Sequence, residues 1–423
     1  MKPIQAKAAR DFAVHVVQRL RVAGFESVWA GGCVRDQLLG RVPKDYDVAT
    51  SATPEEVRQV FGKRKTLPIG ASFGVITVLG PKNAGQIEVA TFRQDAEYSD
   101  GRHPDHVTFS DAQQDALRRD FTINGLFYDP LQQAVIDYVG GESDIQRKVV
   151  RAIGDPGERI AEDKLRMLRA VRFAATFSFA LEPQTLAAVQ QHAGQMIVVS
   201  AERIAAEMRR ILVHSTRRRA IELLQWSGLL AVILPELNDW MSEQPEQCES
   251  WLKIQTQLDD PSFPLALASL LWPVTTAMAD GLKLVEAISN RWKLANEETR
   301  RAHWMLCHEA TLRKAQQLPW PQLQRLLIAP DIRDGLELAT HFERSLTGKT
   351  SHTDYCRERL QLDPDQLNPA PLLTGDDLIS HGITPGKQFA VLLEAVRDAQ
   401  LNESIKDRDE ALLLVDRLCD DQD

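Results

Sequence analysis

The chain has 423 residues, 43% of them hydrophobic and 26% charged, with a net charge of −9, which is the composition of an ordinary soluble protein of more than one domain. No apolar run is long enough to span a bilayer, so we expect no membrane partner. The five cysteines are scattered without C-x-x-C spacing, which argues against a zinc site or a disulfide framework and predicts a cytoplasmic protein.

The first chemically informative segment is a glycine pair between a predicted strand and a predicted helix. Residues 27–30 (S-V-W-A) predict a buried strand that runs into Gly31 and Gly32, and residues 34–39 predict a helix. The glycines therefore lie where backbone amides are free to bind an anion. Arg35, one turn into the helix, would add a bidentate contact to a phosphate.

Two aspartates follow shortly after this turn. Asp45 and Asp47 alternate with Tyr46 and Val48, and the two-residue period of a strand places both carboxylates on one face. Adjacent carboxylates repel unless a cation lies between them, and oxygen ligands beside a phosphate site favour Mg²⁺. Two such ions would activate an attacking hydroxyl and stabilise leaving pyrophosphate. A solvated acidic strand is the alternative for an isolated D-x-D pattern, and the glycine segment upstream disfavours it.

Residues 31–50 (G-G-C-V-R-D-Q-L-L-G-R-V-P-K-D-Y-D-V-A-T) resemble the first motif of class II tRNA nucleotidyltransferases and bacterial poly(A) polymerases, members of the DNA polymerase β superfamily. The resemblance implies an α+β fold. A nucleotidyltransferase head with a small mixed β-sheet and helices would be followed by an elongated, all-α neck, body and tail. It also implies Mg²⁺ as cofactor, ATP and CTP as substrates and tRNA as partner.

Hydrophobic patterns place the predicted domains. Strands are predicted at 75–79, 87–92 and 134–138, and helices at 54–61 and 112–127; after 154–157 (G-D-P-G) helical periodicity dominates. We therefore expect a catalytic head over 1–150, a neck carrying a nucleotide-selecting motif over 151–230, and a tRNA-binding body and tail over 231–423. Residues 1–220 carry 31 Lys and Arg against 26 Asp and Glu, and residues 221–423 carry 19 against 33, so a polyanion should meet the first half.

Glu88 is a candidate third carboxylate. Strand alternation places it opposite Ile87 and Val89, on the polar face. Periodicity alone supports a solvated glutamate equally well, and the resemblance favours a catalytic role beside Asp45 and Asp47.

Residues 117–126 (L-R-R-D-F-T-I-N-G-L) resemble the second motif of the family, in which alanine usually stands at Gly125. On a helix, Arg119 and Asp120 project near each other. Arg119 would then meet the triphosphate, while Asp120 would accept a hydrogen bond from a ribose hydroxyl. A charged surface cluster is the alternative.

Residues 162–173 (E-D-K-L-R-M-L-R-A-V-R-F) bear on base specificity. At helical spacing Asp163 and Arg166 are neighbours. Asp163 would accept from an exocyclic amino group and Arg166 would donate to a ring acceptor, a combination that suits cytosine and adenine and rejects uracil and guanine. A solvated salt bridge is the alternative. The segment resembles the family's E-D-x-x-R-x-x-R-A motif, which implies that the pair is a protein template and that Arg169 and Arg172 contact the nucleotide.

Residues 95–104 are polar and punctuated by Gly101 and Pro104, which predicts a loop. They resemble the family's flexible loop, which helps the site to change from C to A addition. His103 and His106 are not accompanied by a third His or Cys ligand nearby, which argues against a metal site there.

These patterns together favour an enzyme that adds C, C and A to the 3′ end of tRNA without a nucleic-acid template. An A-adding enzyme and a poly(A) polymerase share the same chemistry and stay open, although the acidic end of the chain is unlike the basic tail of poly(A) polymerases. An RNA-binding scaffold with an inactive head is disfavoured by the intact set of site residues. The sequence leaves the oligomeric state open.

Overall fold

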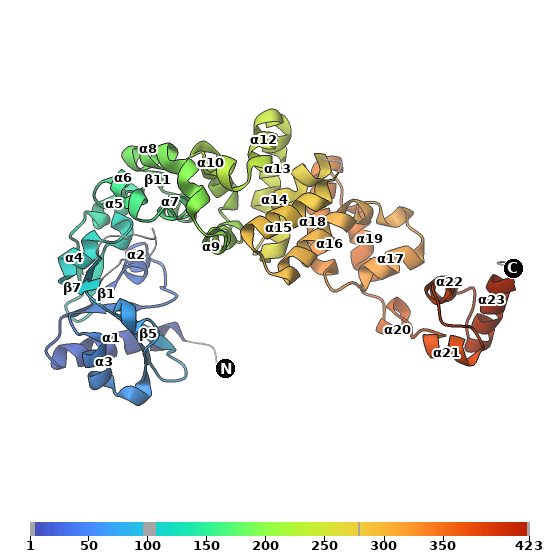
Figure 1. Ribbon diagram of the computed structural model, residues 1–423, viewed down its shortest axis with the longest axis horizontal. Helices are drawn as coiled ribbons and strands as arrows, with labels where there is room; N and C mark the ends of the chain where they lie inside the picture. Colours follow the sequence, from blue (N-terminus) through green and yellow to red (C-terminus); the bar gives the residue numbers. More distant parts are fainter. Residues whose placement is uncertain (1–4, 96–106, 278–279, 421–423) are drawn as a thin grey trace. The chain divides into compact units, whose positions relative to one another are not determined.

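The computed structural model describes residues 5–95, 107–277 and 280–420, and it divides into two compact units, Met1–Ser242 and Glu243–Asp423. The first unit combines a mixed β-sheet with helices and the second is helical, so the predicted α+β class is confirmed (Figure 1). The predicted loop over 95–104 lies almost wholly outside the described residues, as do His103 and His106.

A seven-stranded mixed sheet forms the core of the head, in the order β3-β4-β5-β2-β1-β8-β9. Strand β2 runs parallel to β5, and the other neighbouring strands are antiparallel. The strands of this sheet are β1 (Ser27–Ala30), β2 (Asp47–Thr50), β3 (Thr66–Leu67), β4 (Val75–Leu79), β5 (Gln86–Thr91), β8 (Phe127–Asp129) and β9 (Ala134–Ile136). Two small pairs complete the strands: β6 (Arg93–Asp95) with β7 (Val107–Phe109), and β10 (Val149–Val150) with β11 (Ala180–Leu181).

Both faces of the central strand β1 are buried, as its apolar sequence predicts. Val28 and Ala30 pack in a cluster with Ala112 and Ala116 of helix α4 (Ala112–Leu117). Trp29 points to the opposite face, where the Arg10 guanidinium of helix α1 (Ala6–Val22) lies 5.7 Å from its ring centroid. The strand is thereby fixed on both sides directly before the glycine turn.

The remaining helices of the first unit follow the same pattern of buried apolar faces. They are α2 (Gly32–Leu38), α3 (Pro54–Phe61), α5 (Gly141–Arg147), α6 (Pro156–Glu162), α7 (Arg166–Phe177), α8 (Pro183–His192), α9 (Ala201–Leu212), α10 (Arg217–Trp226), α11 (Leu229–Ile233) and α12 (Pro235–Glu243). Short 3₁₀ turns lie at Lys63–Lys65, Ala71–Phe73, Thr122–Asn124 and Ala193–Val198.

Two predicted elements differ from the structure. The helix expected over 112–127 ends at Leu117, and the chain then forms a turn, an isolated bridge from Phe121 to Ala152 and a 3₁₀ turn before β8. Phe121 is buried edge-on against Phe173, at a centroid distance of 5.7 Å, and this tertiary contact outweighs local helical periodicity. The strand expected to include Asp45 begins only at Asp47.

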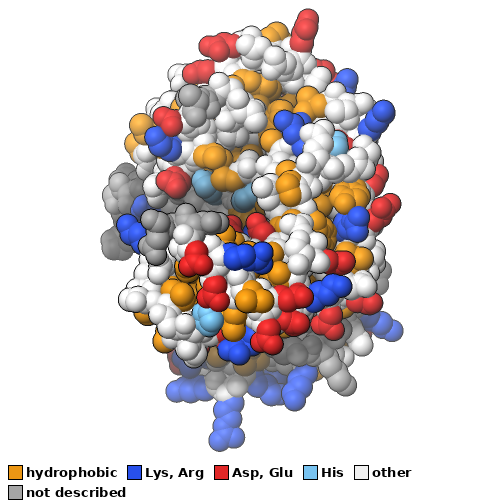
Figure 2. Space-filling model, turned by 90° about the vertical axis from the view of Figure 1, so that its right-hand side faces the viewer, with side chains coloured by type: hydrophobic (Ala, Val, Ile, Leu, Met, Phe, Trp, Pro, Cys, Tyr) orange, Lys and Arg blue, Asp and Glu red, His pale blue; other side chains and the backbone are white. Residues whose placement is uncertain are grey.

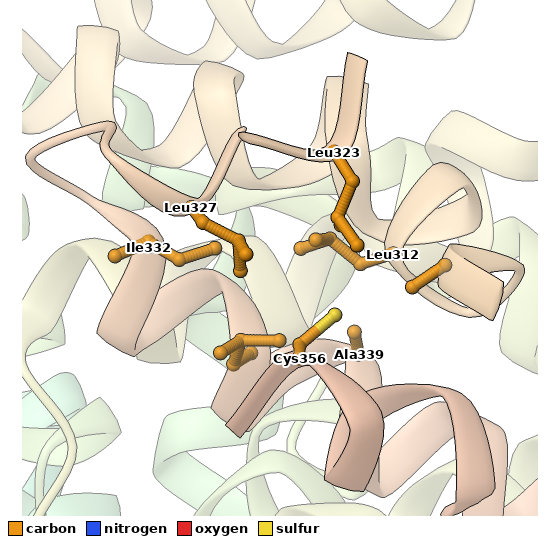
Figure 3. Close-up of a cluster of buried hydrophobic side chains, with 8 residues drawn as sticks. Leu312, Leu323, Leu327, Ile332, Ala339 and Cys356 are labelled. Carbon is orange, nitrogen blue, oxygen red and sulfur yellow. The ribbon is translucent and has the colours of Figure 1, made fainter. Parts of the chain in front are cut away.

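The second unit consists of packed helices, and two of the hydrophobic cores that its described residues form illustrate the packing. One core joins Leu312, Leu323, Leu327, Ile332 and Cys356 from four successive helices, with their side chains converging in Figure 3. The other lies nearer the C-terminal end, around Leu378, Leu392 and Val415. The helices are α13 (Pro245–Gln257), α14 (Phe263–Ala277), α15 (Gly281–Trp292), α16 (Asn296–Leu312), α17 (Trp320–Leu327), α18 (Ile332–Thr347), α19 (Ser351–Arg359), α20 (Pro364–Leu367), α21 (Gly375–Ser380), α22 (Gln388–Leu401) and α23 (Arg408–Asp420), with a 3₁₀ turn at Ala315–Gln317.

The surface of the chain mixes charges of both signs. Figure 2 shows Asp and Glu side chains interspersed with Lys and Arg on the face it presents. Within the described ranges, none of the helices is both long and apolar enough to cross a lipid bilayer.

Candidate active site

The glycine turn connects the end of β1 to the start of α2. Gly31 has φ +71° and ψ −123°, a conformation that side chains disfavour, and a Cβ there would lie 2.9 Å from Arg119 Nη1. Its amide donates to the Leu126 carbonyl oxygen at 3.0 Å, so it is not free for an anion, contrary to the prediction. The Gly31 carbonyl accepts the first helical bonds, from Val34 and Arg35, which leaves the Gly32 amide at the open start of the helix.

Three carboxylates gather beside this turn. Asp47 and Glu88 are direct partners in the parallel β2–β5 pairing, so their side chains share a sheet face, and Asp45 precedes the strand in a loop. Desolvation, then the negative charges of Asp45 and Glu88, raise the pKa of Asp47 to about 6 against the opposing charge of Arg119. Glu88 therefore lies where a third site carboxylate was predicted. The alternation that was to align Asp45 with Asp47 does not apply, because Asp45 lies outside the strand.

An arginine-rich pocket of about 540 Å³ opens next to Asp47, within the size range of small-molecule sites. Six arginines and three aspartates line it, so the pocket has an excess of positive charge suited to a polyphosphate. The lining residues are Gly31, Gly32, Arg35, Asp47, Arg93, Arg118, Arg119, Asp120, Asn124, Asp163, Arg166, Arg169 and Phe173. Nine of the twelve predicted site residues are thus brought together, and Asp45, Glu88 and Arg172 are not among the lining residues.

Arg35 lines this pocket and is largely buried. It donates through Nη1 to Asn124 Oδ1 at 2.5 Å and through Nε to Asp36 Oδ1 at 2.9 Å, and its guanidinium lies 4.4 Å from the Phe177 ring centroid. Protein groups therefore hold its orientation before any ligand binds.

Asp120 lies in the turn after α4 and not on the helix that we predicted. Its Oδ2 accepts from Arg169 Nε at 2.8 Å and Nη2 at 2.5 Å, and its Oδ1 accepts from the Phe121 amide and from Asn124 Nδ2. Burial raises its pKa, but the Arg169 charge and these hydrogen bonds outweigh burial and lower it. The Asp120 carboxylate therefore connects several groups of the pocket wall. A ribose hydroxyl that donates to Asp120 would compete with Arg169 for the same carboxylate.

Asp163 and Arg166 both line the pocket, but they are not on one helix, contrary to the prediction. Asp163 is the extended residue directly after α6, and Arg166 is the first residue of α7. Asp163 Oδ2 accepts from Arg203 Nη2 at 2.7 Å, and Arg166 Nη1 donates to the Arg159 carbonyl oxygen and pairs with Glu162. The two side chains therefore have separate partners instead of each other.

Arg172 is the predicted nucleotide contact that the pocket lining does not include. Its Nε donates to Glu207 Oε2 at 2.6 Å, and its guanidinium lies over the Phe173 ring at 4.1 Å. The nucleotide contact stays a prediction.

Sequence reasoning missed several lining residues. Arg93, Arg118, Asn124 and Phe173 line the pocket, and the buried Asp115 pairs with two of its arginines. The signal for Asp115 was present in D-A-L-R-R, where it precedes the arginines at i,i+3 and i,i+4.

Comparison with known proteins agrees with this geometry. Residues 28–151 match the poly A polymerase head domain, and residues 178–241 match the family described as "Probable RNA and SrmB- binding site of polymerase A". A CCA-adding enzyme of Pediococcus pentosaceus is 32% identical over 94% of this chain and 95% of its own, and one of Enterococcus faecalis is 31% identical over 95% and 94%. The solved structure of the Bacillus stearothermophilus CCA-adding enzyme in complex with CTP is 28% identical and superposes over 98% of each chain with a TM-score of 0.77.

The sheet, the carboxylates beside the glycine turn and the head-domain match define the chain as a nucleotidyltransferase. It belongs to the class II family of CCA-adding enzymes and poly(A) polymerases. Membership of this family implies the use of a divalent metal ion.

Proposed function

We propose that this enzyme adds C, C and A to the 3′ end of tRNA without a nucleic-acid template, using CTP and ATP and releasing pyrophosphate. The observation that supports the proposal is one pocket whose lining contains Asp47, the arginines predicted to bind phosphate, and both Asp163 and Arg166. Both relatives reported above align over nearly the whole chain and are CCA-adding enzymes, which favours CCA addition over A-only or poly(A) addition.

We infer that Mg²⁺ is the metal and that Asp45 and Asp47 hold it. The like charges of Asp45 and Glu88 that raise the pKa of Asp47 are those a divalent cation would relieve. Carboxylate oxygens beside a phosphate site suit Mg²⁺, which takes few carboxylates and completes its shell with water and substrate phosphates. When bound, it supplies activation of the primer hydroxyl and charge stabilisation of the leaving pyrophosphate.

The arginines beside the glycine turn would orient the triphosphate. Arg119 and Arg35 are held in place by protein partners, so the polyphosphate meets fixed donors. Such preorganisation would favour a pose with the α-phosphate near Asp47, where the primer hydroxyl can attack it.

Base selection would fall to Asp163 and Arg166. Arg166 donates to its protein partners through Nη1, and among the described residues none accepts a hydrogen bond from its Nε or Nη2. Asp163 accepts from Arg203 and from the Leu165 amide, which leaves lone pairs on both carboxylate oxygens. Each side chain therefore retains the donor or acceptor that cytosine and adenine require, without breaking an ion pair.

We further propose that residues 1–150 carry the chemistry, 151–230 the base selection, and 231–423 the remaining tRNA contacts. The cysteines of the chain are free thiols, which supports a reducing, cytoplasmic compartment.

The decisive experiment incubates tRNA transcripts that end before, within and after the CC with each labelled nucleotide and Mg²⁺. CCA addition requires C incorporation on the shorter transcripts, a single A after CC, and then termination. Incorporation of A alone would assign an A-adding enzyme, and extension beyond CCA would assign a poly(A) polymerase.

A further inference from the structure

One buried carboxylate connects two arginines of the pocket to the body of the head. Asp115 is 1% exposed and lies on α4, away from the pocket lining. Its Oδ1 accepts from Arg118 Nε at 2.8 Å and Nη2 at 2.7 Å, and its Oδ2 accepts from Arg119 Nη2 at 2.9 Å. The Arg93 amide at the start of β6 lies 3.4 Å from the same Oδ1.

The shared carboxylate offsets the electrostatic repulsion between two arginines of the pocket. Two neighbouring guanidiniums repel each other, and free arginine side chains sample many rotamers, so a triphosphate would have to order both on binding. A shared carboxylate reduces both the repulsion and the ordering cost before the ligand binds. Its negative charge offsets the two positive charges, and its two oxygens hold the two planar guanidiniums by hydrogen bonds. The side chains of Arg118 and Arg119 are each 19% exposed, so both remain accessible from the pocket.

We propose that Asp115 is a positioning residue that holds Arg118 and Arg119 in the orientation that receives the nucleotide's triphosphate. The inference deepens the proposed function and rests on it for the identity of the ligand. Burial raises the pKa of Asp115, but the charges of Arg119 and Arg118 outweigh burial and lower it, so the group is a carboxylate at neutral pH.

The test measures binding apart from turnover. Inorganic tripolyphosphate and CTP are titrated into the full chain in buffer with Mg²⁺, and tRNA binding is measured in parallel. We expect Asp115→Asn to raise the Kd of both phosphate ligands by about tenfold, equivalent to 1.4 kcal/mol. The ratio of CTP to UTP affinity and the Kd for tRNA should change less than about twofold, because the base and RNA contacts are elsewhere.

A matched control separates positioning from stability. Asp129→Asn removes another buried carboxylate of the same unit, one that is 3% exposed and pairs with Arg21 at 2.9 Å outside the pocket. It should lower the melting temperature and leave the Kd for tripolyphosphate unchanged. Equal losses of tripolyphosphate binding in both variants would overturn the proposal, because they would indicate a general structural effect.

Asp115→Glu provides a second variant that keeps the buried charge if Asp115→Asn does not fold. The longer side chain displaces the guanidiniums, so tripolyphosphate binding should again weaken several-fold. A folded variant of either kind with the wild-type Kd for tripolyphosphate would overturn the assignment. If the wild type binds tripolyphosphate but adds no nucleotide to tRNA, the proposed function fails while the positioning role stands.

Discussion

Replacing Gly31 with alanine should damage stability and nucleotide binding through two separable effects. Gly31 has φ +71°, and an added Cβ would lie 2.9 Å from Arg119 Nη1, closer than real Cβ contacts. The backbone effect acts on folding, because a side chain in a sparsely populated region costs about 1–3 kcal/mol. The steric effect acts on the pocket, because Arg119 must move away from Asn124, whose carbonyl oxygen it contacts at 3.3 Å.

These effects translate into measurable changes. A loss of about 2 kcal/mol lowers the melting temperature of a unit of this size by about 4–8 °C. A displaced guanidinium loses a charge-assisted hydrogen bond to phosphate worth about 1.5–3 kcal/mol, which raises the Kd for CTP by about tenfold or more. Calorimetric melting and CTP titration on the same Gly31→Ala preparation measure the two quantities independently.

Gly24→Ala is the matched control for the backbone effect. Gly24 has φ +93°, and a Cβ there would meet nothing within 4 Å. It should therefore destabilise the protein without changing the Kd for CTP. Wild-type CTP binding by folded Gly31→Ala would refute the link between the glycine and the arginine.

Three further predictions concern the carboxylates, base selection and the thiols. Asp47→Ala should reduce nucleotide addition at least about hundredfold, since metal catalysis supplies several kcal/mol, and leave the Kd for tRNA nearly unchanged; a parallel loss of tRNA binding in gel-shift assays would contradict the metal role. Arg166→Ala should reduce the preference for CTP and ATP over UTP and GTP by about tenfold in single-nucleotide incorporation, because a specific base contact contributes on the order of 1–3 kcal/mol, and an unchanged preference would transfer base reading to other residues. Burial raises the pKa of Cys33 and of Cys356 to about 12, so at pH 8 a thiol reagent should modify the partly exposed Cys307 and Cys419 before these two; rapid labelling of Cys33 in the native protein, mapped by mass spectrometry, would contradict its burial.

Elements with a strong local pattern could be predicted from the sequence. Helix α3 spans Pro54–Phe61 as expected, because a capping box at Thr53 and Glu56 and a proline in the first turn determine its start locally. Strand β1 likewise has the predicted bounds, since its apolar run is short and ends at the glycines. The composition of the pocket was also predictable, because the short motifs name most of its lining residues.

Local patterns failed where a distant contact decides the structure. Helix α4 ends at Leu117, and the turn that follows makes tertiary contacts that a continued helix would not allow. In this turn Arg118 and Arg119 pair with Asp115, and Phe121 packs against a helix about fifty residues away in the sequence. Helical periodicity continues through this segment in the sequence, so the pattern alone does not predict that the helix ends at Leu117. The same cause separates Asp163 from Arg166, since the partner of Asp163 is Arg203, forty residues further on.

These failures have a common consequence for how the pocket works. The motifs show which charged side chains are present, but the tertiary structure determines which carboxylate pairs with which arginine. Asp115 holds two arginines, Asp120 holds Arg169, and Glu162 holds Arg166, and each acid uses only part of its arginine's donor set. Under the proposed function, an incoming triphosphate would therefore meet guanidiniums whose orientation the protein has already fixed. Binding would then not have to order flexible side chains, which favours attack of the primer hydroxyl on the nucleotide's α-phosphate.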